Sequence, residues 1–259
     1  MFRENTLKRR IAAGKPALGV WIQMAEPSIA EIASLAGYDF LILDNEHGHA
    51  SLDTLVHMMR AAQAGDATLM VRCPGSDGDY IKRVMDAGAE ALMIPMLDTP
   101  EEAKAVVKAA LYPPAGRRGY SSPTVRASGY GAAPDHAKRA NDEVFITVQI
   151  EHTDAVDRAA EIAAVEGVDC VFIGANDLAG SLGHMGDLGH PEVEARIRQC
   201  EDAVRSAGKP LGTIPRPGAS VLDLAKEGYL ILAGVADSYS LRQAFTADVA
   251  AFRKQTGER

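Results

Sequence analysis

Short apolar segments recur eight times along this 259-residue chain, and their repetition limits the folds that the chain can adopt. These segments are rich in β-branched residues and occupy residues 17–22, 39–44, 68–72, 91–95, 144–151, 169–174, 210–214 and 229–234. A strand that reads as a continuous apolar run is buried on both faces, which is the usual state of a strand in a parallel sheet. The sequence therefore predicts eight parallel strands.

Segments with helical periodicity separate these strands; many begin with Ser, Thr, Asp or Pro and most end on Gly, as helices commonly do. They cover residues 28–37, 51–65, 76–89, 99–111, 153–167, 191–208 and 218–228. We expect an eighth helix over 238–255 and a short helix over 5–14 that covers the bottom of a barrel. This alternation favours a single-domain (β/α)8 (TIM) barrel over residues 1–259, with an open doubly wound sheet as the structural alternative.

The composition, with 47% hydrophobic and 24% charged residues, is typical of a soluble globular protein. The net charge of −8 provides no general cationic field, so neither nucleic acid nor an anionic membrane is an expected partner. Residues 1–19 lack the apolar core of a signal peptide, and no segment reaches the roughly 18 apolar residues of a spanning helix. Three cysteines without metal-type spacing fit a reducing compartment, so we expect a cytoplasmic protein.

One segment is too long for a simple connection between a strand and a helix. Residues 112–136 are rich in Gly, Pro, Ser and Arg, and loops of this length are usually functional or disordered. The segment could be a lid that brings Arg117, Arg118 or Arg126 towards an anionic substrate, or it could be a surface excursion or an oligomer contact. The sequence leaves both interpretations open.

Polar and aromatic side chains accumulate where the expected strands end. In a barrel of this kind the catalytic residues stand at the carboxyl ends of the strands, so these side chains are expected to face one mouth. They are Trp21, Gln23, Asp44, Glu46, His47, Arg72, Gln149, Glu151, Asn176 and Asp177.

Two of these residues, Glu151 and Asp177, follow neighbouring strands and are candidate metal ligands. Carboxylate oxygens suit Mg²⁺ or Mn²⁺, with water and substrate completing the coordination. The alternative is that each carboxylate caps the helix that follows it. Arg72 ends an apolar strand with no acidic residue near it in sequence, so its charge requires either a salt bridge or a ligand anion.

His47 is the candidate general base, because a histidine titrates near neutral pH and a carboxylate, Asp44, stands three residues before it. The pair His47-x-His49 also suggests zinc, as in barrels of the amidohydrolase type, with His152 and Asp237 as further ligands. That match weakens because the fourth expected strand lacks a bridging lysine and the sixth lacks a histidine. No lysine projects from an expected strand, so a Schiff-base aldolase is not indicated.

Several motifs in one order are more specific than any single residue. The order is LILDNEHG, VRCPG, DAGAEALMIPMLDTPEEA, YPPAGRRG, VQIEH, VFIGANDLAGSLGHMGDLGHPEV and AGKPLG. It resembles the HpcH/HpaI family of class II pyruvate aldolases over nearly the whole chain. The resemblance implies a metal-dependent barrel that reversibly cleaves 4-hydroxy-2-oxo acids into an aldehyde and pyruvate, or a close analogue such as hydroxypyruvate. It also implies a homo-oligomer, a hexamer built as a dimer of trimers, whose C-terminal helix packs on or exchanges with a neighbouring subunit.

The resemblance also implies roles for individual residues. Glu151 and Asp177 would hold Mg²⁺, Mn²⁺ or Co²⁺. His47 would be the base and Arg72 the cation that stabilises the enolate. Asp86 would make the histidine more basic, and the resemblance allows this residue to act from a neighbouring subunit.

The remaining mouth residues receive supporting roles. Gln149 and Asn176 would line the pyruvate and metal site, with Trp21 contributing to substrate binding. Asp44 is expected to orient His47 or its loop by hydrogen bonding, and Glu46 is given no direct contact with the metal. A citrate-lyase-like enzyme that acts on acyl-CoA, and a barrel that binds a keto acid without turning it over, stay open as alternatives.

Overall fold

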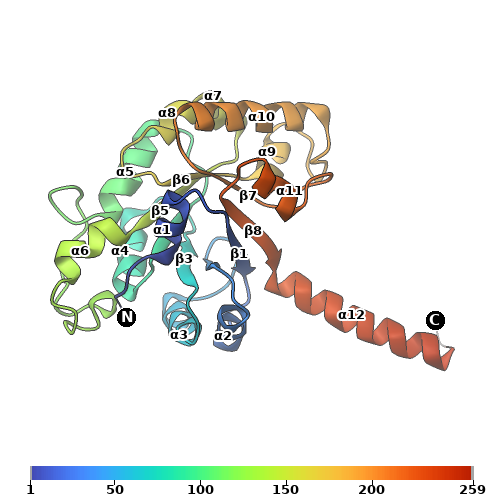
Figure 1. The fold of residues 1–259 in the computed structure, drawn as a ribbon, viewed down its shortest axis with the longest axis horizontal. Helices are drawn as coiled ribbons and strands as arrows, with labels where there is room; N and C mark the ends of the chain where they lie inside the picture. The colour runs from blue at the N-terminus through green and yellow to red at the C-terminus, as the bar shows by residue number, and fades with distance from the viewer. Residues whose placement is uncertain (1, 258–259) are drawn as a thin grey trace.

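The computed structural model describes residues 2–257, and within them eight parallel strands form a closed barrel (Figure 1). The strands are β1 (Ala17–Ile22), β2 (Phe40–Asp44), β3 (Thr68–Arg72), β4 (Ala91–Ile94), β5 (Phe145–Ile150), β6 (Cys170–Ile173), β7 (Leu211–Thr213) and β8 (Ile231–Ala236). Each strand pairs with the next, and β8 pairs with β1 to close the sheet. The (β/α)8 barrel expected from the sequence is confirmed, and the open sheet is excluded by the β1–β8 pairing.

Helices cover the outside of the barrel where helical periodicity predicts them. They are α2 (Pro27–Leu35), α3 (Leu52–Ala62), α4 (Gly78–Ala87), α5 (Pro100–Ala110), α7 (Thr153–Asp157), α8 (Ala159–Ala163), α10 (Pro191–Ser206) and α11 (Val221–Lys226). Helix α1 (Thr6–Ala12) closes the bottom of the barrel, because Leu7 and Ile11 pack into the same buried cluster as the strand side chains inside it. The expected bottom helix is therefore confirmed.

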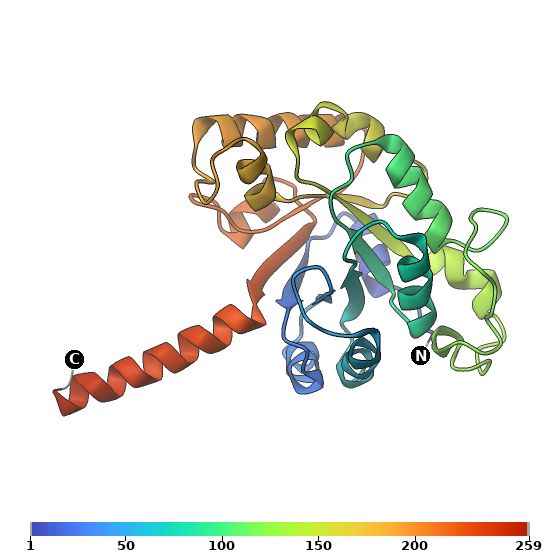
Figure 2. The ribbon, with the colours of Figure 1, turned by 180° about the vertical axis from the view of Figure 1, so that it is seen from behind.

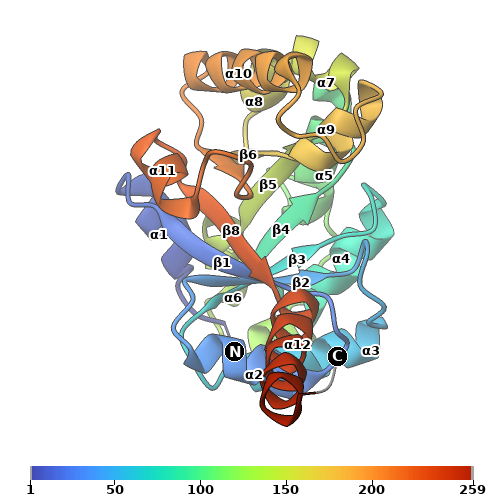
Figure 3. The ribbon, with the colours of Figure 1, turned by 90° about the vertical axis from the view of Figure 1, so that its right-hand side faces the viewer.

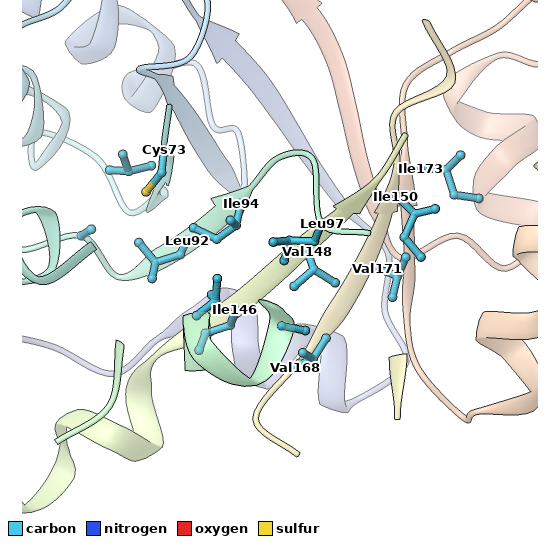
Figure 4. Packing of buried hydrophobic residues seen from close by; sticks show 14 of the residues in the cluster. Cys73, Leu92, Ile94, Leu97, Ile146, Val148, Ile150, Val168, Val171 and Ile173 are labelled. Atoms are coloured by element: carbon cyan, nitrogen blue, oxygen red, sulfur yellow. The ribbon is translucent and has the colours of Figure 1, made fainter. Parts of the chain in front are cut away.

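Two apolar cores follow from the alternation of side chains along each strand. The inner core fills the barrel and includes Phe40 and Ile42 of β2 and Met70 of β3. The outer core lies between the strands and the helices; Figure 4 shows the part of it formed by residues of β4, β5 and β6 such as Ile94 and Val148. The inward alternation of β2 and β3 continues to their last residues, so the barrel itself aims Asp44 and Arg72 at the mouth.

The structure differs from the sequence expectation in several local elements. The helix expected over 153–167 is divided into α7 and α8 at Arg158, where the backbone leaves helical geometry (φ −111°, ψ 9°). Two further helices, α6 (His136–Glu143) and α9 (Ala175–Ser181), and the short 3-10 helix η1 (Arg126–Ser128) lie outside the ranges in which the sequence predicted helices.

The last helix, α12 (Asp237–Thr256), projects away from the barrel instead of covering it (Figures 1, 2 and 3). Only Asp237 at its start is buried, and the side chains beyond it are almost all exposed. The eighth helix expected over 238–255 is present, and within one chain it does not pack on the barrel. Within residues 2–257, none of the helices combines the length and hydrophobicity needed to span a membrane.

Candidate active site at the barrel mouth

A buried ion pair between β2 and β3 forms the floor of the mouth. The register of the two strands places Asp44 beside Arg72, whose Nε and Nη2 donate to the two carboxylate oxygens at 2.9 and 2.6 Å. The guanidinium carbon lies 4.5 Å from the centre of the Trp21 ring. The sequence left open whether Arg72 would find a salt bridge or a ligand anion, and the structure shows a salt bridge.

Asp44 also organises the turn that follows β2. Its Oδ1 accepts the backbone N–H groups of Glu46 and His47 at 3.1 and 3.2 Å. Burial alone would raise the pKa of Asp44, but the hydrogen bonds from Arg72 and from this turn outweigh it and hold the pKa below its usual value. A Cβ at Gly48 would lie 2.1 Å from the Asp44 carbonyl oxygen, so the turn closes only with glycine there.

Glu46 lies between the cation and the candidate base. Its Oε2 is 2.8 Å from Arg72 Nη1 and 3.9 Å from His47 Nε2, and the imidazole itself is largely exposed. Burial raises the pKa of Glu46 despite the attraction of Arg72, and repulsion from Asp44 and Asp177 adds to the effect of burial. Sequence reasoning assigned Glu46 no direct role, whereas the structure links its carboxylate electrostatically to every charged group of the mouth.

Glu151 is a buried carboxylate held by two hydrogen bonds. Its Oε1 accepts the backbone N–H of Met96 at 2.7 Å, and its Oε2 accepts Gln149 Nε2 at 3.1 Å. Met96, whose N–H makes the first of these hydrogen bonds, has a φ of 53°, which is uncommon for a residue with a side chain. A Cβ at Gly174 would lie 2.4 Å from Glu151 Oε2. The carboxylate therefore sits in a close-fitting cradle.

This carboxylate has an excess of negative charge around it. Burial raises the pKa of Glu151 to about 7, and repulsion from Glu46 and Asp177 adds to the effect of burial. Asp177 stands in the first turn of α9, and it lines a cavity of about 60 Å³ together with Asn176, Gln149, Arg72 and other residues. The mouth thus concentrates carboxylates that a bound cation would stabilise.

The capping interpretation of Glu151 and Asp177 is wrong. The N-cap of α7 is His152, whose side chain accepts a backbone N–H, and α9 begins after Gly174 without a side-chain cap. Moreover, the side-chain oxygen Oε1 of Gln149 is buried without a hydrogen-bond partner beside Glu151. Asp177 and Gln149 line one cavity, and Gln149 donates a hydrogen bond to the Glu151 carboxylate beside it. Two carboxylates and an unpaired amide oxygen are a donor set that fits a hard divalent cation.

Asp86 lies elsewhere in the chain. It stands in the last turn of α4, where its Oδ1 accepts Arg118 Nη2 at 2.6 Å, and the Arg118 guanidinium stacks over Tyr112 at 4.3 Å. Helix α4 runs from the mouth towards the bottom of the barrel, and Arg118 lines a cavity there with Asn5 of the N-terminal segment. Within one chain, the structure does not bring Asp86 to His47.

The arginines of segment 112–136 are also directed away from the mouth of their own chain. Arg118 pairs with Asp86, Arg126 Nη1 donates to the carbonyl oxygen of Ala87 at the end of α4, and Arg117 is exposed. The interpretation of this segment as a lid over its own active site is therefore wrong, because α4 carries its anchoring groups at the far end of the barrel.

The zinc interpretation of His47 and His49 also fails on geometry. Asp237 accepts the backbone N–H groups of Gln23 and Met24, so this carboxylate ties β8 to β1. His152 serves as the cap of α7. Across residues 2–257, neither His47 nor His49 belongs to a group of three potential ligands with metal-like spacing.

Comparisons with known proteins identify a family and relatives that this chain resembles. The sequence profile of the HpcH/HpaI aldolase/citrate lyase family matches residues 17–244. A hydroxypyruvate/pyruvate aldolase of Deinococcus radiodurans is 39% identical over 254 residues, which are 98% of this chain and 92% of the relative. A 4-hydroxy-2-oxovalerate aldolase of Novosphingobium aromaticivorans is 39% identical over 237 residues, covering 91% of this chain and 90% of the relative.

The fold of the chain also matches solved structures. A crystal structure of an HpcH/HpaI aldolase/citrate lyase family protein from Burkholderia cenocepacia superposes with a TM-score of 0.89 at 35% identity. The match covers 96% of this chain and 99% of the other. Sequence and structure comparisons thus span the barrel and every mouth residue described above.

Proposed function

The chain belongs to the HpcH/HpaI aldolase/citrate lyase family and is a carbon–carbon lyase, and from this premise we propose a class II pyruvate aldolase. Its substrates would be 4-hydroxy-2-oxo acids, cleaved reversibly into an aldehyde and pyruvate or hydroxypyruvate. One observation carries the proposal: Arg72 pairs with Asp44 and Glu46 at the mouth, where Asp177 lines the same cavity and the buried carboxylate of Glu151 follows β5, and no lysine of residues 2–257 lies in a strand. The chemistry therefore depends on cations and not on a Schiff base.

Glu151 and Asp177 would hold the divalent cation, Mg²⁺, Mn²⁺ or Co²⁺, with the Gln149 side chain beside them. When bound, such an ion acts as a Lewis acid that polarises the 2-oxo group of the substrate. The Met96 N–H and the tight contact at Gly174 fix the Glu151 carboxylate in one orientation. Asn176 and Trp21, which line the same cavity, would contact the pyruvate part of the substrate.

Arg72 supplies positive charge where the enolate oxygen develops. A guanidinium carries five N–H groups. Arg72 donates two of them to Asp44, and its Nη1 lies 2.8 Å from Glu46 Oε2 as an ion pair, so N–H groups of Arg72 that Asp44 does not use can meet a substrate oxygen. The ion pair with Asp44 and the Trp21 ring hold this group in place before substrate arrives. A cation that is already oriented stabilises developing charge without reorganising.

His47 would remove the proton of the 4-hydroxyl group. The C3–C4 bond then breaks, its electron pair forms the pyruvate enolate, the aldehyde leaves, and a proton returns to C3. Asp44 supports this step by fixing the backbone at His47. Because Asp86 is far from His47 within one chain, its proposed role requires a neighbouring subunit that brings Asp86 to the mouth.

Helix α12 supports a homo-oligomer, and we place it against a neighbouring copy of the chain in a hexamer built as a dimer of trimers. Phe245, Val249 and Phe252 are spaced so that they share one face of the projecting helix, and each is largely exposed in the single chain. The buried thiols of Cys73, Cys170 and Cys200 support the cytoplasmic location expected from the sequence.

The test is cleavage of racemic 4-hydroxy-2-oxopentanoate, followed by the pyruvate released. We expect activity with Mn²⁺, Mg²⁺ or Co²⁺, its loss in EDTA, and its loss in Glu151→Gln. The matched control is Glu161→Gln, because Glu161 is exposed on α8 and should leave activity unchanged. Activity that persists in EDTA would contradict the proposal, and turnover of CoA thioesters in place of free oxo acids would favour the citrate-lyase-like alternative.

A further inference from the structure

A second group of potential metal ligands lies outside the proposed active site, in the connection from α9 to α10. His184, His190 and Glu192 each place one ligand atom within 4.8 Å of the others, and no other such group of three or more occurs within residues 2–257. The two imidazole rings stack at 3.5 Å between their centroids, with 18° between their planes. His184 Nε2 lies 2.9 Å from Glu192 Oε2.

Backbone hydrogen bonds hold this connection in the conformation that brings the three side chains together. The His184 N–H donates to the Ala179 carbonyl oxygen at 2.8 Å, and the Asp187 N–H donates to the His184 carbonyl oxygen at 2.9 Å. The His190 ring caps α10 by accepting the Glu192 N–H. With the backbone in this position, rotation of the side chains would direct all three ligand atoms at one metal ion.

We propose that His184, His190 and Glu192 form a second metal site, which takes a borderline divalent ion such as Zn²⁺, Co²⁺ or Ni²⁺. Two imidazoles and one carboxylate, with water in the fourth position, are a known ligand set for tetrahedral zinc. Ligand atoms in such a site are about 3.4 Å apart, given metal–ligand bonds of about 2.1 Å. The rings must therefore turn out of their stack, and the partly exposed side chains of His184 and Glu192 leave room for this.

Metal binding requires changes in the hydrogen bonds of both imidazoles. The hydrogen between His184 Nε2 and Glu192 has to move, by tautomer exchange, to Nδ1 so that Nε2 offers its lone pair. If His190 binds through Nδ1, its lone pair no longer accepts the Glu192 N–H, and the cap of α10 is given up. The ion would replace these contacts with three coordinate bonds that join the connection to the start of α10.

The two sites would differ in the ions that they prefer. Imidazole nitrogen favours zinc, cobalt and nickel, whereas the carboxylate and amide oxygens of the mouth favour magnesium and manganese. The connection follows α9, which carries Asn176 and Asp177 to the mouth. An ion at the second site would therefore hold the end of α9 without contacting the substrate, as a structural clip.

The site is tested by titrating metal-free protein with Zn²⁺ in a calorimeter. The double variant Glu151→Gln, Asp177→Asn removes the proposed mouth ligands, so any zinc that remains bound reports the second site. We expect about one zinc per chain in this background, and a loss of affinity of at least tenfold when either His184→Ala or His190→Asn is added. Asparagine is chosen at position 190 because it caps helices well.

His57→Ala in the same background is the control, because His57 is a half-exposed histidine of α3 away from this group. It should leave the zinc affinity unchanged. Hydrogen exchange gives a second measure: zinc should protect the amides of residues 182–190 in the double variant and not after His184→Ala. If the double variant binds no zinc, or if either histidine substitution leaves the affinity unchanged, the second site does not exist, and the aldolase assay is unaffected by that result.

Discussion

Replacing Arg72 by methionine tests whether the buried ion pair at the mouth has the energetic role that the structure gives it. The Asp44 side chain is fully shielded from solvent, and Arg72 supplies its two shortest hydrogen bonds. Removing one partner of a buried pair leaves an uncompensated charge and typically costs about 3–5 kcal/mol of folding stability. We expect Arg72→Met to lose an amount in this range near neutral pH.

The sign of the pH dependence follows from the pKa of Asp44. In the wild type, Arg72 holds this pKa below its usual value despite burial, so Asp44 stabilises the fold down to acidic pH. Without Arg72, burial dominates and raises the folded-state pKa, as burial does for Glu151, whose pKa rises to about 7. The charged carboxylate then destabilises the variant at high pH, and protonation relieves the penalty as the pH falls through the raised pKa.

Urea unfolding in EDTA, at several values between about pH 8 and about pH 5, measures this gap between variant and wild type. The gap should narrow towards the acidic end, and adding Asp44→Asn to Arg72→Met should recover part of the lost stability. Arg198→Met is the control, because Arg198 is an exposed residue of α10 paired with Glu194, and exposed pairs contribute only about 0–1 kcal/mol. A gap that is the same at every pH, or no recovery in the double variant, would refute the reasoning.

Three further substitutions probe other parts of the mouth and the projecting helix. Gly174→Ala should displace the Glu151 carboxylate and weaken Mn²⁺ binding, measured by electron paramagnetic resonance, in a protein that stays folded. His47→Asn should lower kcat by about 10²–10⁴-fold while Mn²⁺ binding is kept; an unchanged rate would remove His47 as the base. Phe252→Asp should yield smaller assemblies in light scattering, and an unchanged mass would place α12 outside the interface.

The barrel and most of the mouth could be predicted because both depend on local patterns. Apolar runs and helix caps recur at regular spacing, and a parallel barrel gathers the residues after each strand at one end. The sequence alone therefore predicts that Asp44, Arg72, Gln149 and Glu151 lie at the mouth of the barrel. The register of β2 and β3, which pairs Asp44 with Arg72 at the ends of the two strands, confirms this position for both residues.

Other features depend on contacts that no local pattern encodes. The position of Glu46 between Arg72 and His47 arises from the turn that Asp44 closes, so its charge alone could not reveal its neighbours. Arg118 pairs with Asp86, which lies 32 residues earlier in the chain, and this long-range contact is what argues against the lid interpretation that the sequence left open. Helical periodicity predicts that α12 is a helix but not where a helix with an apolar face will dock.

In the proposed function, cations held at this mouth generate and stabilise a pyruvate enolate. Deuterium exchange into the methyl group of pyruvate, followed by NMR in D₂O, tests it without any choice of aldehyde. Exchange should require Mg²⁺, Mn²⁺ or Co²⁺ and disappear in EDTA, in Arg72→Met and in Glu151→Gln. Exchange that is unaffected by EDTA, or that is absent with each of these ions in the wild-type protein, would contradict metal-assisted enolate formation at this site.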